Sequence, residues 1–202
     1  MPQAFGVFAP FLTDADSRNM DPSPELCRGI GHVVERNRAM KSLIVCASKS
    51  HGNTRRVADR MAEVLGAEVV TPESVDPASL RQYDLVGFGS GIYYMTVDPR
   101  LRDLLRRLST ADHTRAFTFF TSGAREIPLR GYHKPVRKWL ESKGFEVIGS
   151  FSCRGWDTIG PFGFIGGINR GRPDDHDLQR AAAFASRIRK QVGGQSNAVA
   201  GR

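Results

Sequence analysis

The sequence predicts an α/β fold in which a parallel β-sheet is sandwiched between helices. From Met40 onward, short apolar runs typical of buried strands alternate with segments whose apolar residues recur at helical spacing. The connections between most of these elements are short, as in β-α units whose strands pair in parallel. A chain of 202 residues is also long enough to bury a sizeable core in one domain.

Each element of this alternation has its own signal. An unbroken apolar run predicts the first strand, and Asp98 followed by Pro99 is a cap and first-turn proline that predicts a helix start. Gly144 predicts a helix end. The predicted strands are 42–47, 68–71, 84–89, 115–121 and 146–153, and the predicted helices are 54–65, 98–108, 132–143 and 174–191.

The two ends of the chain lack the alternation. Residues 1–39 carry clusters of Pro, Asp, Ser and Asn without a sustained period, so we expect a disordered extension or a true start at Met40. Residues 193–202 are expected to form a flexible C-terminal tail. The predicted domain is therefore 40–192.

Composition narrows the classes of function. No apolar run approaches the roughly 18 residues of a membrane span. Three widely spaced cysteines give neither a zinc site nor a full disulfide framework, so a cytoplasmic location is expected. The net charge of +8 favours an acidic partner, but the sequence holds no nucleic-acid-binding motif, so specific nucleic-acid binding is not expected.

The loop after the first strand, Ser48-Lys49-Ser50-His51-Gly52-Asn53-Thr54, has the features of an anion site. Its hydroxyls and its glycine precede a helix N-terminus, where free N–H groups and the helix dipole favour negative charge. It matches neither the P-loop nor the dinucleotide fingerprint, so a terminal monophosphate is the expected ligand. The alternative is a plain turn in which Thr54 caps the helix.

Two further loops follow the third and fourth predicted strands. The first, 89–96, offers glycines for close approach and flat or polarizable side chains at Tyr93, Tyr94 and Met95. The second, 121–126, offers hydroxyls and backbone amides. Because parallel strands present their carboxyl ends at one edge, we expect the three loops to meet there. The alternative for each is a simple turn.

The spacing S-x-S-x-G-N-T, together with these loops, resembles the flavodoxin family over nearly all of 41–192. The resemblance implies a flavodoxin-like doubly wound five-stranded parallel sheet of order 2-1-3-4-5, with helices on both faces and FMN as cofactor. The implied phosphate-binding residues are Ser48, Ser50, His51, Gly52, Asn53 and Thr54. The implied ring-binding residues are Ser90, Gly91, Ile92, Tyr93, Tyr94, Thr121, Ser122 and Gly123.

Two features depart from the resemblance. Flavodoxins that shuttle electrons are typically acidic, whereas this chain is basic. A glycine-rich loop of about 20 residues, 154–173, precedes the last helix and is longer than usual. It could serve as a lid, a docking loop or a substrate wall, or it could be anchored by Phe162 and Phe164 in an apolar cluster.

The resemblance implies electron transfer with a redox partner protein or a small-molecule electron donor or acceptor. Apolar packing and the phosphate charge would tune the flavin, and no catalytic side chain or metal ligand is expected. One alternative is an FMN-dependent oxidoreductase with its own substrate, of the quinone reductase or protoporphyrinogen oxidase type. Another is an interaction or sensing module without flavin.

Overall fold

The computed structural model describes residues 40–111, 113–123, 132–158 and 166–199, with the backbone alone at Ser50 and 195–199. The expectation for residues 1–39, and the anchoring role considered for Phe162 and Phe164, lie outside the described residues. None of the described helices is both long and apolar enough to cross a membrane.

The described residues form one parallel sheet with a short antiparallel addition. The parallel strands lie in the order β2-β1-β3-β5-β6, which confirms the predicted 2-1-3-4-5 arrangement. The sixth strand, β4, pairs antiparallel with β3 and was not predicted. The strands are β1 (Ser42–Ala47), β2 (Glu68–Val70), β3 (Leu85–Tyr93), β4 (Thr96–Val97), β5 (Arg115–Ser122) and β6 (Glu146–Arg154).

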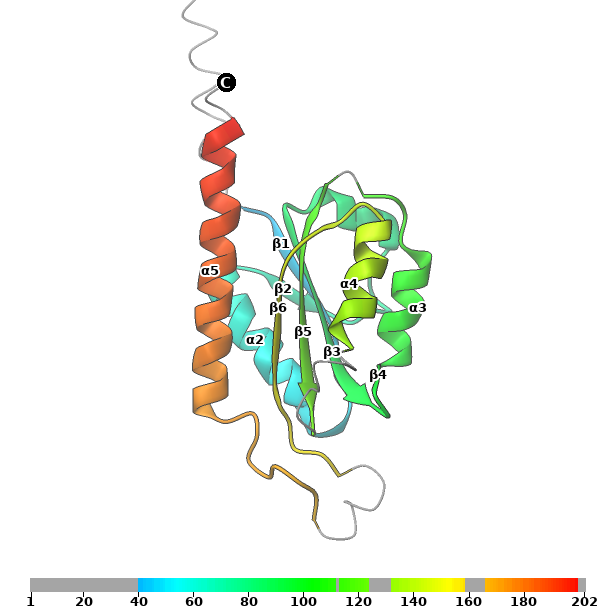
Figure 1. Ribbon diagram of the computed structural model, residues 1–202, viewed down its shortest axis with the longest axis vertical. Helices are drawn as coiled ribbons and strands as arrows, with labels where there is room; N and C mark the ends of the chain where they lie inside the picture. Colours follow the sequence, from blue (N-terminus) through cyan, green and yellow to red (C-terminus); the bar gives the residue numbers. More distant parts are fainter. Residues whose placement is uncertain (1–39, 112, 124–131, 159–165, 200–202) are drawn as a thin grey trace, which may run out of the picture. The chain divides into compact units, whose positions relative to one another are not determined.

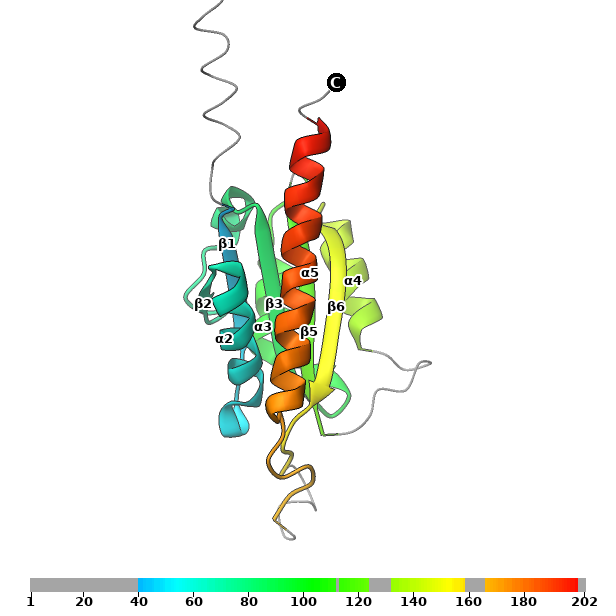
Figure 2. The same ribbon diagram turned by 90° about the vertical axis from the view of Figure 1, so that its left-hand side faces the viewer.

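Helices cover both faces of the sheet (Figure 1). Helices α2 and α5 pack on one face and α3 and α4 on the other, and Figure 2 shows α5 and α4 on opposite sides of the strands. The helices are α2 (Asn53–Leu65), α3 (Pro99–Arg107), α4 (His133–Ser142) and α5 (Asp175–Val199), with short 3-10 turns η1 (Ser50–Gly52) and η2 (Pro77–Gln82).

Strand alternation divides the core into two layers. In β1, Leu43 and Val45 pack toward α3 and α4, whereas Ile44 and Cys46 pack toward α2 and α5. All six residues of β1 are buried because helices cover both sides of a parallel sheet. The unbroken apolar run in the sequence therefore reflects a central strand.

The third parallel strand is longer than the sequence indicated. It was expected to end at residue 89 but continues to Tyr93, because Ile92 and Tyr93 pair with Val97 and Thr96 of β4. The two-residue turn between these strands, Tyr94-Met95, has φ angles of 49° and 64°. Such a turn usually contains Gly or Asn, so its sequence signal is missing here. Ser90 through Tyr93 consequently belong to a strand instead of a loop.

The last helix also exceeds its predicted span. It begins at Asp175 and continues to Val199, beyond the expected end at 191 and into the segment expected to be a tail. Acidic residues at Asp175 and Asp177 occupy its first turn, where they complement the helix dipole.

Two glycines in β3 make room for aromatic side chains of β5. A Cβ on Gly87 would lie 2.4 Å from the ring of Phe117, and a Cβ on Gly89 would lie 2.0 Å from the ring of Phe119. Both phenylalanines are fully buried between the sheet and the helices. The glycines therefore let large rings lie directly over the neighbouring strand.

We predict that Gly89→Ala lowers the free energy of unfolding by about 1–3 kcal/mol, since the new methyl group forces the Phe119 ring to move. The matched control is Gly193→Ala in α5, where a Cβ meets nothing within 4 Å. The control should raise stability by about 0.5–1 kcal/mol through helix propensity. Urea unfolding measures both; equal midpoints for Gly89→Ala and the wild type would contradict the packing argument.

Candidate functional site

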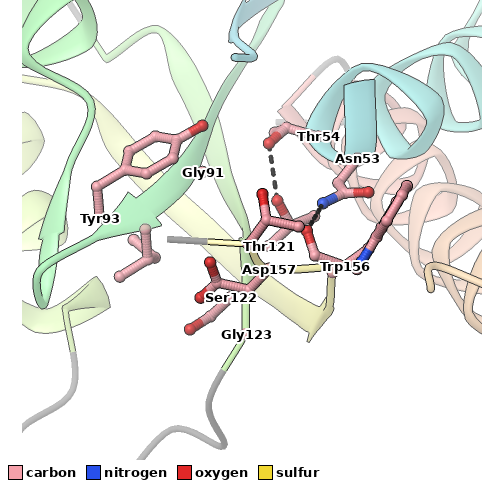
Figure 3. A pocket seen from close by; sticks show the side chains of 12 residues that line it. Asn53, Thr54, Gly91, Tyr93, Thr121, Ser122, Gly123, Trp156 and Asp157 are labelled. Carbon is pink, nitrogen blue, oxygen red and sulfur yellow. Dashed lines mark hydrogen bonds between the residues drawn. The ribbon is translucent and has the colours of Figure 1, made fainter. Parts of the chain in front are cut away.

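The carboxyl ends of β1, β3, β5 and β6 meet at one edge of the sheet, and a pocket lies between them (Figure 3). Its walls come from the first turn of α2, the ends of β3 and β5, and the segment that follows β6. The lining residues are Asn53, Thr54, Gly91, Ile92, Tyr93, Thr121, Ser122, Gly123, Gly155, Trp156, Asp157 and Thr158.

The loop after β1 turns sharply into α2. His51 and Gly52 adopt successive left-handed conformations with φ of 58° and 66°, and Gly52 is the N-cap of α2. Because Gly52 is the N-cap and Thr54 lies within the helix, the alternative in which Thr54 caps the helix is wrong. The first-turn amides of an α-helix have no intrahelical partner. The first turn of α2, with Asn53 and Thr54, lies beside the pocket.

The hydroxyl of Thr54 contacts a neighbouring strand instead of capping the helix. It lies 2.7 Å from the hydroxyl of Thr121 at the end of β5, and both residues are buried. Figure 3 shows the two side chains meeting at the centre of the pocket wall. This bond joins the start of α2 to the carboxyl end of β5.

The segment after β6 lies against the loop after β1. The side-chain amide of Asn53 donates from Nδ2 to the Trp156 carbonyl at 2.7 Å. The rings of His51 and Trp156 stack with centroids 3.9 Å apart. The His51 Nε2 and Thr158 Oγ1 atoms lie 3.0 Å apart. A Cβ on Gly155 would lie 2.8 Å from the Asn53 amide nitrogen, so glycine permits this approach. The segment forms one wall of the pocket.

The sequence indicated the 154–173 loop as a possible lid, docking loop or substrate wall, but it did not predict Gly155, Trp156, Asp157 and Thr158 as lining residues. Asp157 lies so close to Gly123 that a Cβ there would meet its carboxylate. Asp157 also pairs with Ile168 in a short antiparallel bridge, which folds the loop back on itself. The sequence signal that could have revealed this wall was the Trp156-Asp157 pair shortly after the last predicted strand.

The expected ring-binding residues divide into two groups. Tyr93 lines the pocket and its hydroxyl lies over Gly91, opposite Trp156 in Figure 3. Burial, with a contribution from Asp98, raises the pKa of Tyr93. Tyr94 does not line the pocket: it lies at the hairpin tip beside Met95, where the two side chains are 84% and 54% exposed.

Of the remaining predicted residues, Ile92, Thr121, Ser122 and Gly123 line the pocket, whereas Ser48, His51, Gly52 and Ser90 do not. The predicted role of the Ser50 side chain lies outside what the structure describes. Ser48 instead accepts the Arg55 N–H at 3.2 Å, within the first turn of α2. Ser90 is fully buried and donates to the Gly91 carbonyl at 2.6 Å. These residues shape the backbone around the pocket.

An ion pair lies behind the loop after β1. Asp98, only 2% exposed, accepts from Arg100 Nε at 2.9 Å, and Arg100 Nη2 donates to the Ser48 carbonyl at 3.1 Å. Burial by itself would raise the pKa of Asp98. Hydrogen bonds from the Arg100 side chain and backbone, with its charge, outweigh burial and hold this pKa below its ordinary value.

Other reactive groups do not form a second site in the described part of the chain. Burial raises the pKa of the Cys46 and Cys153 thiols to about 12, so both stay protonated near neutral pH. Asp174 and Asp177 lie close together with His176, but Asp174 accepts the Asp177 N–H at 2.9 Å and Arg172 pairs with Asp177 at 2.7 Å. These bonds cap α5.

Comparison with known proteins identifies the family. Residues 43–154, more than half of the chain, match the family described as "Flavodoxin domain". The chain is also 38% identical over 151 residues to the uncharacterized protein MJ0298 of Methanocaldococcus jannaschii, covering 75% of this chain and 99% of that protein. The chain therefore belongs to the flavodoxin family.

Solved structures share the fold at lower identity. A flavodoxin from the domain Archaea matches with a TM-score of 0.55 and 17% identity over 76% of this chain and 99% of its own. Oxidised Flavodoxin 1 from Bacillus cereus matches with a TM-score of 0.58 and 20% identity over 74% and 97%. The Flv1 flavodiiron core from Synechocystis sp. PCC6803 matches with a TM-score of 0.56 and 13% identity, over 85% of this chain and 41% of its own.

We predict that Thr54→Val destabilises the protein by about 1–3 kcal/mol, because it leaves the buried Thr121 hydroxyl without its partner. The double variant Thr54→Val, Thr121→Val removes both hydroxyls and should recover part of the loss. The unfolding free energies of the wild type, the two single variants Thr54→Val and Thr121→Val, and the double variant form a double-mutant cycle. Strictly additive losses would show that the hydroxyl pair contributes no coupling.

The lowered pKa of Asp98 predicts how stability depends on pH. Its contribution is fully present above the unfolded-state pKa of about 3.9 and is lost as pH falls through the lower folded-state value. Asp98→Asn should therefore be less stable than the wild type at neutral pH, and the gap should narrow below about pH 4. Unfolding measured from pH 7 to pH 2.5 tests this; a constant gap would refute it.

Proposed function

We propose that this protein binds FMN in the pocket at the carboxyl edge of the sheet and transfers electrons through it. The observation that carries the proposal is the helix start at Asn53, which follows a glycine N-cap and opens beside a pocket lined by hydroxyls. Such a helix start favours a phosphate group. The family and the reversal of strand order at β1 and β3 add support, because ligands of this fold bind at that point.

The donor set suits the parts of FMN. The backbone amides of Asn53 and Thr54, with the hydroxyl-rich loop before them, would hold the phosphate. Thr121 and Ser122 offer hydroxyls to the ribityl chain, and Gly91 with Tyr93 offers an open backbone and an aromatic ring to the flavin. When bound, FMN supplies the electron chemistry; the protein supplies binding, orientation and electrostatics.

An electron carrier with an acidic redox partner is the function we favour. The net charge of +8 would attract such a partner. Free, buried thiols at Cys46 and Cys153 fit a reducing cytoplasm as its compartment. No described side chain has to act as an acid or base in this role.

A second candidate is an FMN-dependent oxidoreductase with its own small-molecule substrate. The segment from Gly155 to Thr158 favours it, because it walls the pocket and holds Trp156 against His51. A wall of this kind can bound a substrate as well as a cofactor. The same basic charge would then attract an acidic substrate.

Direct titration tests FMN binding. The protein should bind FMN tightly enough to quench its fluorescence, and Ser50→Ala with Thr54→Val should weaken binding about tenfold, or ~1.4 kcal/mol. Thr54→Ser is the matched control, since it keeps the hydroxyl. A wild type that leaves added FMN unquenched would contradict the proposal and favour a module without flavin.

Steady-state turnover separates the carrier from the oxidoreductase. The FMN-loaded protein is mixed with NADH or NADPH and a panel of quinones, without any other protein. The carrier predicts rates close to those of free FMN at the same concentration. Rates far above free FMN would reject the carrier in favour of the oxidoreductase.

A further inference from the structure

We infer that Arg100 and Asp98 are a positioning pair that fixes the loop after β1 relative to β3, and so aligns the two sides of the pocket. The inference rests on the proposed FMN site. Neither side chain lines the pocket, and both act through the residues they hold.

The first contact is with the loop. Arg100 Nη2 donates to the carbonyl of Ser48, the first residue of the hydroxyl-rich loop, at 3.1 Å. The Ser48 hydroxyl meanwhile accepts the Arg55 N–H in α2 at 3.2 Å. Ser48 is therefore held on one side by Arg100 and on the other by α2, whose first residues line the pocket.

The arginine is itself held in one orientation. Its Nε donates to Asp98 Oδ1 at 2.9 Å and its Nη2 to Asp98 Oδ2 at 3.1 Å, which makes a bidentate pair. The Arg100 N–H also donates to Asp98 Oδ1 at 3.0 Å at the start of α3. A bidentate arginine has a fixed geometry that a lysine ammonium does not reproduce.

Asp98 is tied through its backbone to the other side of the pocket. The Asp98 N–H donates to Ser90 Oγ at 2.8 Å, and Ser90 Oγ donates to the Gly91 carbonyl at 2.6 Å. Gly91 lines the pocket. A continuous series of hydrogen bonds thus runs from Ser48 through the ion pair to β3.

The pair acts through geometry more than through charge. Asp98 neutralises the guanidinium of Arg100. A second carboxylate, that of Glu73, also lies near it, with Oε1 3.6 Å from Arg100 Nη1. The ion pair itself therefore carries little net charge toward the loop after β1. Loss of Arg100 should let the Ser48 carbonyl shift, and with it the first turn of α2, so the phosphate loses affinity while the ring contacts remain.

Comparing FMN with riboflavin, which lacks the phosphate, tests this. Dissociation constants of both flavins are measured for the wild type, Arg100→Met, Arg100→Lys and Arg106→Met. Arg106, which is exposed and pairs only with Asp103 among the described residues, is the matched control on the same helix. We expect Arg100→Met and Arg100→Lys to weaken FMN about tenfold, with riboflavin changed less than twofold and Arg106→Met unchanged.

Adding Asp98→Asn to Arg100→Met should weaken FMN no further, since the two residues act as one unit. Equal loss of FMN and riboflavin, or unchanged FMN affinity in both Arg100 variants, would overturn the positioning role. Should Arg100→Met fail to fold, Arg100→Lys carries the same comparison. A wild type that binds neither flavin would instead reject the proposed function, so the two failures are distinguishable.

Discussion

The parallel pairing of β1 with β3 is the constraint on which the rest of the structure depends. Their register runs from Ser42 opposite Leu85 to Ala47 opposite Ser90. Strand order reverses at this pair, so α2 leaves β1 toward one face of the sheet and α3 follows β3 on the other. The diverging connections leave a crevice at the carboxyl ends. The pocket therefore follows from topology before any side chain is considered.

Side chains then fix the walls of that crevice through contacts between segments far apart in the sequence. Thr54 bonds Thr121, Asn53 bonds the Trp156 carbonyl, and Arg100 bonds the Ser48 carbonyl. The partners of the first turn of α2 and of the loop before it lie in three different segments: the end of β5, the segment after β6 and the first turn of α3. Contacts from several segments thus hold the start of α2 in place.

Local sequence patterns predicted most of the strands and helices, but not the contacts between residues far apart in the sequence. The alternation of strands and helices followed from alternating apolar runs, and the strand order followed from the resemblance to the flavodoxin family. The end of β3 was missed because Tyr94 and Met95 lack the usual sequence signal of a tight hairpin turn. The wall at Trp156 was missed because its contact with Asn53 spans 103 positions, which no local pattern reveals. The alternative that Thr54 caps the helix is wrong because the N-cap position is taken by Gly52.

Amide chemical shifts test the central claim, that the start of α2 receives the phosphate of FMN. Nitrogen-15-labelled protein is titrated with FMN and, separately, with riboflavin. We predict large shifts at the amides of Gly52, Asn53 and Thr54 with FMN that are absent with riboflavin, while the Thr121 to Gly123 amides respond to both. Shifts of the same size at Asn53 and Thr54 with both flavins, or none with FMN, would contradict the account.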